Sequence, residues 1–261
     1  MTIVSVAATG FATLMLGLLV LPVGALVARG GAAGVQLLIA DPELQHALGL
    51  TATAATVATL ITGLLGTPLA YLLARGRMPA GSIIGALVEL PLVIPHPVAG
   101  IALLLAFGRA SPIGASLARL GLGIVGSPLG IGLAMLFVSA PLYVIASREA
   151  IARVDRRFED VARTLGDSPW QAVRRVTLPL AGRGIAAAAV VMWARAVSEF
   201  GAIVILTYNP KVASVLSYDR FTAFGLDAAL PVAAVLVLLA IIPLAVLRSL
   251  RARAQPWEPE A

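Results

Sequence analysis

The sequence predicts an all-α integral membrane protein with six transmembrane helices. Hydrophobic residues make up 59% of the chain and charged residues only 12%, compared with about 25% charged residues in soluble domains. Because lipid cannot hydrogen-bond free backbone groups, only helices and closed β-barrels cross a bilayer. The apolar segments here are too long and too continuous for barrel strands, which leaves helices.

Each predicted span holds about 20 apolar residues, the length that crosses the hydrocarbon. The first segment lacks a basic start, and its apolar run exceeds the roughly 7 to 15 residues of a signal peptide, so we expect an uncleaved helix. The six spans, in chain order, are Ile3–Val27, Leu48–Leu73, Ile83–Phe107, Pro128–Ser147, Gly184–Ile205 and Ala228–Leu247.

Prolines interrupt the third span. Pro91, Pro95 and Pro97 lack the backbone N–H that a helix needs, and His96 lies among them, so the span is expected to be hinged or kinked. Irregular backbone at membrane depth is tolerated only against protein or a water-filled cavity. We therefore expect this span to line an internal path, with an inert kink as the alternative.

The segment between the third and fourth spans, Ser111–Leu122, is too short and too rich in glycine to cross the bilayer. It is mildly amphipathic and is expected at the outer face. Ser127 and Pro128 have the character of a helix cap and a first helical residue, so they set the start of the fourth span.

Arginine placement predicts the orientation, because cytoplasmic loops of membrane proteins are rich in Lys and Arg. The loop at about 148–183, the turn with Arg75 and Arg77, and the tail from Arg248 on carry most of these charges. Arg109 and Arg119, in a loop on the opposite side, count against the rule. Both termini are nevertheless expected in the cytoplasm of a cell-membrane protein.

The arginine-rich loop has the sequence of a helix-turn-helix. Phe158–Leu165 lacks Pro and Gly, and Gly166 supplies the left-handed residue that ends a helix. Asp167 or Ser168 is expected to cap a second helix, with Pro169 at its first position. That helix should run to about Val176 and stop at Leu178-Pro179.

The same loop carries a spaced motif. Asp160, Val161 and Ala162 are followed after three residues by Gly166, and after nine more residues by Val176 and then Leu178-Pro179. This pattern resembles the loop of the permease subunits of binding-protein-dependent ABC importers, which reads Glu-Ala-Ala, three residues, Gly, nine residues, Ile-x-Leu-Pro. Asp160, Val161 and Ala162 fall on Glu-Ala-Ala, and Val176 falls on the isoleucine. The alternative is an ordinary amphipathic loop.

The resemblance implies a type I importer fold in which this loop docks into a cleft of a cytoplasmic ATPase subunit. The coupling candidates run from Asp160 to Trp170 and include Asp167, Ser168 and Pro169. Trp170 suits a buried contact at a protein interface, but burial against its own subunit is an equal alternative. ATP and Mg would be bound by the ATPase, and no cofactor is expected in this chain.

Four ionisable residues lie in the predicted spans: Glu89, His96, Arg195 and Glu199. They need an explanation, because charges in the membrane are costly and usually face protein or water. Arg195 and Glu199 lie one helical turn apart and can neutralise each other, and Glu89 is a further possible partner for Arg195. We favour structural pairing over direct contact with substrate. The candidates for the path are Glu89, Pro91, Pro95, His96, Pro97, Arg195 and Glu199.

The chain lacks the signatures of an enzyme. Its lone lysine, Lys211, is not part of a Gly-x4-Gly-Lys-Ser/Thr phosphate loop, so ATP hydrolysis is not expected here. His46 and His96 are far apart and lack the acidic or cysteine neighbours of a zinc site. We divide the chain into 1–47 (first helix and outer loop), 48–247 (permease domain) and 248–261 (tail), with Arg251–Ala261 expected to be disordered.

Two further stretches, Leu90–Phe107 and Ala194–Phe221, resemble molybdate/tungstate permeases, and sulfate permeases share a looser form of both. The family resemblance covers roughly Leu48 to Leu247. It implies an assembly of two copies of this chain, two ATPase subunits and an extracytoplasmic oxyanion-binding protein. A stand-alone secondary transporter and a noncatalytic membrane scaffold remain the rival interpretations.

Overall fold

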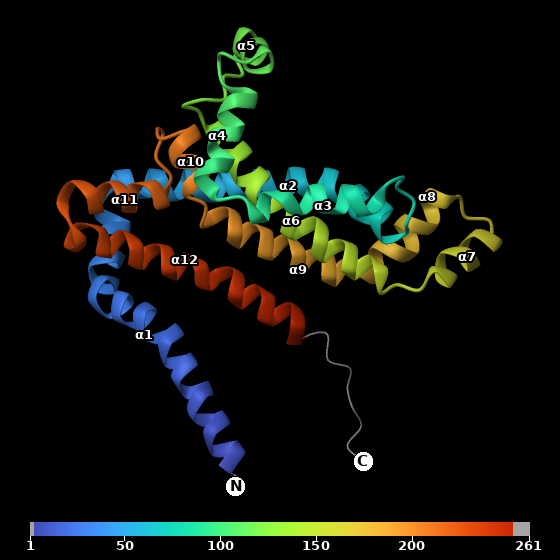
Figure 1. Ribbon diagram of the computed structural model, residues 1–261, viewed down its shortest axis with the longest axis horizontal. Coiled ribbons are helices and arrows are strands. Elements are labelled where there is room, and N and C mark those ends of the chain that lie inside the picture. Colours follow the sequence, from blue (N-terminus) through green and yellow to red (C-terminus); the bar gives the residue numbers. More distant parts are fainter. Residues whose placement is uncertain (1–2, 253–261) are drawn as a thin grey trace. The chain divides into compact units, whose positions relative to one another are not determined.

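The computed structural model describes residues 3–252, and all regular structure in that range is helical (Figure 1). Within this range, five helices are long and apolar enough to cross a membrane, and a sixth crossing results if one bent pair of helices counts as a single span. The described chain divides into two compact units. One unit joins the residues up to Leu48 with Val212–Ile241, and the other joins Gly49–Lys211 with the residues from Ile242 on.

The first unit contains α1 (Ile3–Ala40), the start of α2 (Pro42–Ala74), α11 (Ala213–Phe224) and the first part of α12 (Leu226–Ala252). Its core consists of apolar side chains from α2, α11 and α12. Arg220 of α11 forms an ion pair of 2.5 Å with Asp41. The core residues are Leu44, Ala47, Ala213, Leu216, Val232 and Val235.

The predicted first span, Ile3–Val27, ended too early, and the predicted outer loop up to residue 47 is largely helical. Only Asp41 separates α1 from α2, and its Oδ1 caps α2 by accepting hydrogen bonds from the backbone N–H groups of Glu43 (3.0 Å) and Leu44 (3.2 Å). Gly30 and Gly34 lie inside α1, where an added Cβ would come within 2.5 Å and 2.7 Å of α12 carbonyl oxygens. These glycines allow close helix packing.

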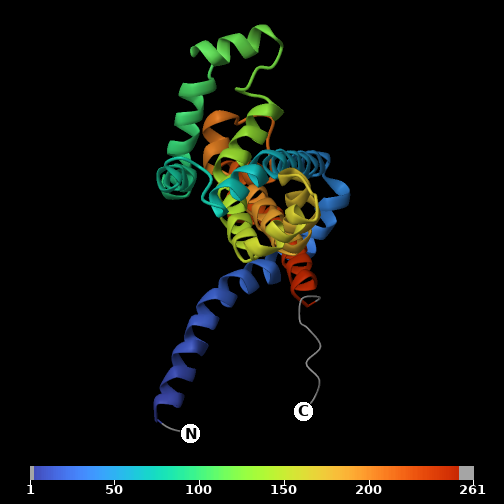
Figure 2. The same ribbon diagram turned by 90° about the vertical axis from the view of Figure 1, so that its right-hand side faces the viewer.

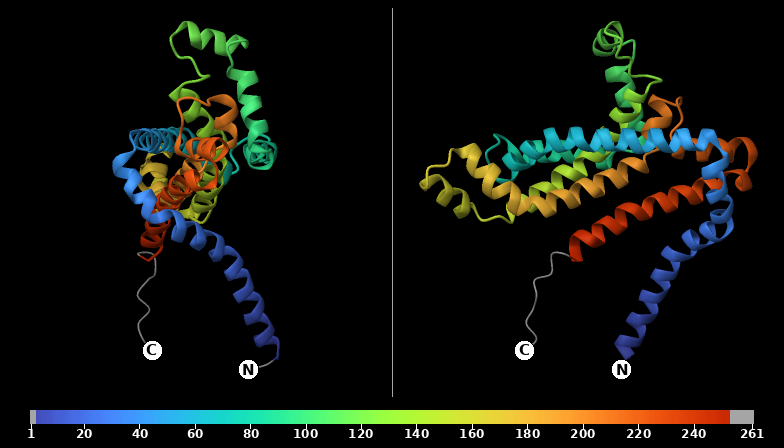
Figure 3. Two further views of the ribbon diagram at one scale, coloured as in Figure 1. Left: turned by 90° about the vertical axis from the view of Figure 1, so that its left-hand side faces the viewer. Right: turned by 180° about the vertical axis from the view of Figure 1, so that it is seen from behind.

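The second unit is built on α2 from residue 49 on, α6 (Pro128–Ala152) and α9 (Leu178–Val197). Figures 1 and 3 show these three helices running side by side. Ser127 caps α6 as expected, because its Oγ accepts a hydrogen bond from the N–H of Gly130. Tyr143 of α6 and Thr67 of α2 share a hydrogen bond of 2.7 Å between their hydroxyl groups.

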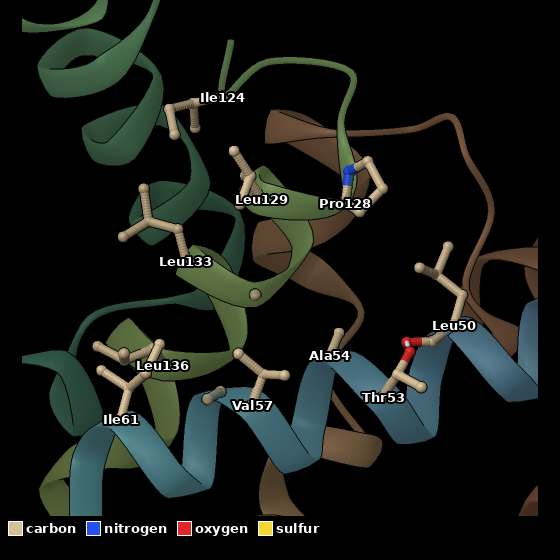
Figure 4. Close-up of a pocket in the computed structure, with 12 residues that line it drawn as sticks. Leu50, Thr53, Ala54, Val57, Ile61, Ile124, Pro128, Leu129, Leu133 and Leu136 are labelled. Atoms are coloured by element: carbon tan, nitrogen blue, oxygen red, sulfur yellow. Dashed lines mark hydrogen bonds between the residues drawn. The ribbon is translucent and has the colours of Figure 1, made fainter. Parts of the chain in front are cut away.

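An apolar groove of about 400 Å³ lies between α2 and α6 (Figure 4). Val57 and Ile61 line it from α2, and Leu133 and Leu136 line it from α6. None of the residues that line the groove carries a charge. The groove is therefore unsuited to bind an ion.

The third predicted span, Ile83–Phe107, is broken as the prolines predict. α3 (Gly81–Val93) and α4 (His96–Phe107) meet at an angle of 114°, and Figure 2 shows α4 rising from α3, which is seen end-on. The break lies at Ile94 and Pro95, while Pro91 is accommodated inside α3. Pro97 lies in the first turn of α4, where its missing N–H costs no helical bond.

The fifth predicted span, Gly184–Ile205, is wrong as a single helix. α9 ends at Val197, and α10 (Gly201–Leu206) follows after a short break. The carboxylate of Glu199 accepts a hydrogen bond of 2.8 Å from the N–H of Ala202. The side chain thus satisfies a backbone group that the break leaves without a helical partner.

The remaining boundaries differ because helices continue past the apolar windows that hydropathy detects. α6 runs five residues beyond Ser147, to Ala152, and α12 runs five beyond Leu247, to Ala252. Arg251 therefore belongs to a helix, and the rest of the predicted disordered tail lies outside the described residues. The segment after α4 forms a short helix, α5 (Pro112–Arg119), capped by Ser111.

Candidate functional site

The arginine-rich loop contains the predicted helix-turn-helix. α7 (Arg156–Thr164) begins after Asp155, whose carboxylate accepts a hydrogen bond of 2.9 Å from the N–H of Arg157. Gly166 has a φ of +102°, as expected for the residue that ends this helix. The N–H groups of Gly166 and Asp167 bond back to the carbonyls of Arg163 (3.1 Å) and Ala162 (3.0 Å). This pair of bonds is the Schellman arrangement.

The second helix, α8 (Pro169–Ala172), is capped by Ser168 rather than Asp167. The backbone N–H of Ser168 donates to the Gln171 side chain (2.7 Å), and the N–H of Gln171 donates to the Ser168 hydroxyl (3.4 Å). This reciprocal capping fixes the start of the helix. Asp167 instead forms an ion pair of 2.6 Å with Arg175.

The prediction that Leu178-Pro179 stops the second helix is wrong. α8 passes through a π-helical segment, η1 (Val173–Thr177), directly into α9, which begins at Leu178. The N–H of Leu178 bonds to the carbonyl of Val173, five residues back. This wider turn, together with the position of Pro179 in the first turn of α9, lets the chain stay helical despite the missing proline N–H.

Large apolar side chains are exposed on this otherwise polar loop. Trp170 is 64% exposed, so within this chain it is not buried against its own subunit. Val161 and Leu165 are exposed to 55% and 84%. Of the other candidates, Ala162 is buried, Val176 and Leu178 are half-buried, and Asp160, Ser168, Pro169 and Pro179 are exposed.

Sequence reasoning missed a buried ion pair beside these candidates. Glu159 of α7 lies 2.6 Å from the guanidinium of Arg75, at the end of α2. Tyr71 (3.0 Å) and Thr177 (2.7 Å) also donate hydrogen bonds to this carboxylate. Arg75 had been used only as a charge that indicates orientation. The signal that could have revealed the site is a tyrosine and an arginine one helical turn apart, at the end of an apolar helix.

The surroundings of Glu159 favour its charged form. Burial by itself raises the pKa of this carboxyl, but the hydrogen bonds from Thr177, Arg75 and Tyr71 outweigh burial, so its pKa lies below the usual value. The carboxylate therefore stays ionised at neutral pH, as the pair with Arg75 requires.

A second polar cluster lies where the two helix breaks meet. Arg195 of α9 donates a hydrogen bond of 2.7 Å to Glu199 and lies 2.9 Å from the ring of His96. His96 Nδ1 is 3.2 Å from the same carboxylate. α10 approaches α4 closely here, because an added Cβ on Gly201 would lie 2.7 Å from the Cβ of His96. The predicted pairing of Arg195 with Glu199 is thus present.

Glu89 lies apart from this cluster. It lines a separate pocket of about 490 Å³, together with Arg148 of α6 and small residues of α3 such as Gly85. The structure thus brings together His96, Arg195 and Glu199 but not Glu89. Within residues 3–252, no three His, Asp or Glu side chains are placed to hold a metal ion.

Comparison with known proteins gives consistent results. Residues 66–256 match the family described as binding-protein-dependent transport system inner membrane component. A molybdate/tungstate transport system permease protein of Thermococcus kodakarensis is 43% identical over 175 residues, which are 67% of this chain and 66% of that relative, just under two thirds of its length. A probable molybdenum ABC transporter permease protein of Haloferax volcanii is 38% identical over 95% of this chain and 92% of its own.

Two further matches are more distant in sequence. A sulfate transport system permease protein of Escherichia coli is 30% identical over 90% of this chain and 88% of its own. The crystal structure of a bacterial ABC transporter that imports the polysaccharide alginate contains a chain with a TM-score of 0.71. That match covers 95% of this chain and 94% of the other at 18% identity, so it concerns the fold alone.

Proposed function

This chain belongs to the family of binding-protein-dependent transport system inner membrane components, and we propose that it provides the path for molybdate or tungstate in an ATP-driven importer. The observation that carries this proposal is its similarity to two permease proteins named for molybdate, tungstate or molybdenum transport, one of them matched over nearly its whole length. Sulfate is the second candidate cargo, because a sulfate permease is 30% identical over most of its length.

The loop from Asp160 to Trp170 is the proposed dock for the ATPase. Its two short helices are fixed at a turn by Gly166, and Trp170 is exposed next to that turn. An exposed tryptophan on a loop that also exposes Val161 and Leu165 is typical of an interface that a partner covers. ATP and Mg would be bound by that partner.

The proposed assembly contains two copies of this chain, two ATPase subunits and an extracytoplasmic oxyanion-binding protein. The concentration of arginine in the loop and near the end of α12 favours an orientation with both termini in the cytoplasm. The membrane would then be the cell membrane. Labelling with an impermeant thiol reagent tests this orientation, because the chain has no cysteine of its own. Ser217→Cys should react in intact cells and Ser168→Cys should not.

The cluster of His96, Arg195 and Glu199 suits passage of an anion rather than its tight binding. Arg195 is already neutralised by Glu199, so it presents little net charge to an anion. A divalent oxyanion held by several free arginines at low dielectric would leave slowly. Capture by the binding protein would then precede entry, and the isolated permease should not bind the anion tightly.

The test is reconstitution of the complete assembly in vesicles, with uptake of labelled molybdate, tungstate and sulfate measured at equal concentration. Uptake should require ATP, the ATPase and the binding protein, and should favour molybdate or tungstate. A preference for sulfate would change the assigned cargo to sulfate but would leave the assignment as an ATP-driven importer in place. Uptake without ATP would instead support a secondary transporter and overturn the proposal.

A further inference from the structure

Four segments of the second unit converge on the buried pair of Arg75 and Glu159. Arg75 directly follows the last residue of α2, Glu159 lies in the first turn of α7, and Thr177 ends η1. The guanidinium of Arg75 also donates a hydrogen bond of 2.9 Å to the carbonyl of Val154, in the link between α6 and α7. We call Tyr71, Arg75, Glu159 and Thr177 the joint.

The joint connects parts of the chain that are far apart in sequence. The loop is covalently continuous with α6 and α9, so any movement of the loop acts on these two helices directly. α2 has no such connection, since Arg75 and Glu159 are 84 positions apart. At the end of α2, side-chain bonds take the place of a covalent link.

The bonding at Glu159 favours a single arrangement. Its Oε1 accepts hydrogen bonds from Arg75 (2.9 Å) and Thr177 (2.7 Å), and its Oε2 accepts one from Tyr71 (3.0 Å). The side chains of Arg75 and Glu159 are only 2% and 7% exposed. A buried carboxylate loses much more when its partners move away than an exposed one does. The joint should therefore resist sliding of α7 against α2.

Resting on the proposed function, we propose that Arg75 and Glu159 are positioning residues for coupling. They fasten the ATPase-docking loop to the end of α2, so that a movement imposed on the loop carries α2 with it as well as α6 and α9. Neither residue needs to contact the ATPase or the anion. Their effect is on how much of the loop's movement reaches the membrane helices.

The test compares Glu159→Gln with a matched control in the reconstituted assembly. Glutamine keeps the size of the side chain but removes the charge that Arg75, Thr177 and Tyr71 bond to. The control, Arg175→Gln, breaks an ion pair in the same loop whose arginine side chain is 64% exposed. Three quantities are measured: the affinity for the ATPase, stimulated ATP hydrolysis, and anion transported per ATP.

Glu159→Gln should bind the ATPase with unchanged affinity and hydrolyse ATP, while the anion transported per ATP falls about tenfold. Arg175→Gln should keep the ratio of the unmodified protein. An unchanged ratio in Glu159→Gln, or an equal loss in the control, would overturn the inference. If the unmodified permease itself shows no ATP-dependent uptake, the proposed function fails instead.

A second measurement does not depend on transport. Spin labels on Pro79→Cys, after the end of α2, and Thr164→Cys, at the end of α7, report the distance across the joint. The distance distribution should stay narrow with and without ATP, and should broaden when Glu159→Gln is added. If Glu159→Gln does not fold, Thr177→Val, which removes one of the three donors, should show the same broadening to a smaller degree. A distribution unchanged by either substitution would contradict the joint.

Discussion

Two ion pairs between an arginine and a buried glutamate stand out among residues 3–252, and they differ in how completely they are enclosed. In the joint, the side chains of Arg75 and Glu159 are 2% and 7% exposed. In the cluster at the helix breaks, Glu199 is fully buried, but Arg195 is 21% exposed and His96 is 40% exposed. The enclosed pair is suited to hold helices together. The second pair is enclosed less completely, because Arg195 and His96 are partly exposed.

The largest expected effect is at the enclosed pair. Arg75→Met leaves the carboxylate of Glu159 buried without its cation, and should lower the free energy of unfolding by about 3 to 5 kcal/mol. The double replacement with Glu159→Gln should recover part of that loss, because the stranded charge is gone. Thermal denaturation in detergent measures both, and a double variant as unstable as the sum of the single variants would contradict the pairing.

The pair of Arg195 and Glu199 should also show non-additive losses of stability, but each loss should be smaller. Arg195→Met should cost about 1.5 to 3 kcal/mol, because Glu199 keeps the hydrogen bond from Ala202 and the nearby ring of His96. The losses of Arg195→Met and Glu199→Gln should be non-additive in the double variant. Strictly additive losses, measured by the same denaturation, would favour independent or substrate-facing roles.

Gly166→Val tests whether the conformation of the turn matters, because it changes no charge. Gly166→Val places a β-branched residue at a φ of +102°, which should cost about 1 to 2 kcal/mol locally. No atom lies within 4 Å of the added Cβ, so the effect comes from backbone strain rather than a clash. Binding of the ATPase and stimulated hydrolysis should both fall while the membrane helices stay folded. Normal transport in this variant would falsify the assignment of the turn as the dock.

The smallest effect is confined to acid pH. The pKa of Glu159 in the folded protein lies below its ordinary value of 4.5, so its contribution to stability is complete above that value and is lost as pH falls through the lower, folded pKa. Melting temperatures between pH about 6 and about 3 should fall less steeply in Glu159→Gln than in the unmodified protein. If melting temperature falls equally with pH in both proteins, Glu159 does not contribute to the loss of stability in acid.

Rules for helix caps and helix breakers correctly predicted several helix ends from the nearby sequence alone. Gly166 ends α7 and Ser127 caps α6, because in each case the deciding groups lie within a few residues. The break near Pro95 also follows from the missing N–H groups. The same rules failed at Leu178-Pro179, because they assume α-helical spacing and the chain adopts a π-turn there. The family, and the fold that it implies, followed from the spaced motif.

Contacts between distant residues account for most of what was missed. Tyr71, one helical turn before Arg75, hints at a polar site, but the local sequence does not indicate that the partner is a glutamate 84 positions away. The end of α9 at Val197 was also missed, because the break depends on Glu199 bonding to Ala202 and on close packing of α10 with α4. The roles of the loop in docking and of the cluster in passage remain predictions.

The π-turn has a mechanical consequence. Because Leu178-Pro179 does not interrupt the helix, Pro169–Val197 forms one continuous rod of 29 residues, about 43 Å long at about 1.5 Å per residue. It begins at the loop and ends beside Arg195. A tilt of about 5° at the loop would displace the far end by about 4 Å, more than the diameter of a water molecule. If the loop rotates as the proposed coupling requires, this rod would act as a lever arm and move its far end, beside Arg195, by several ångströms.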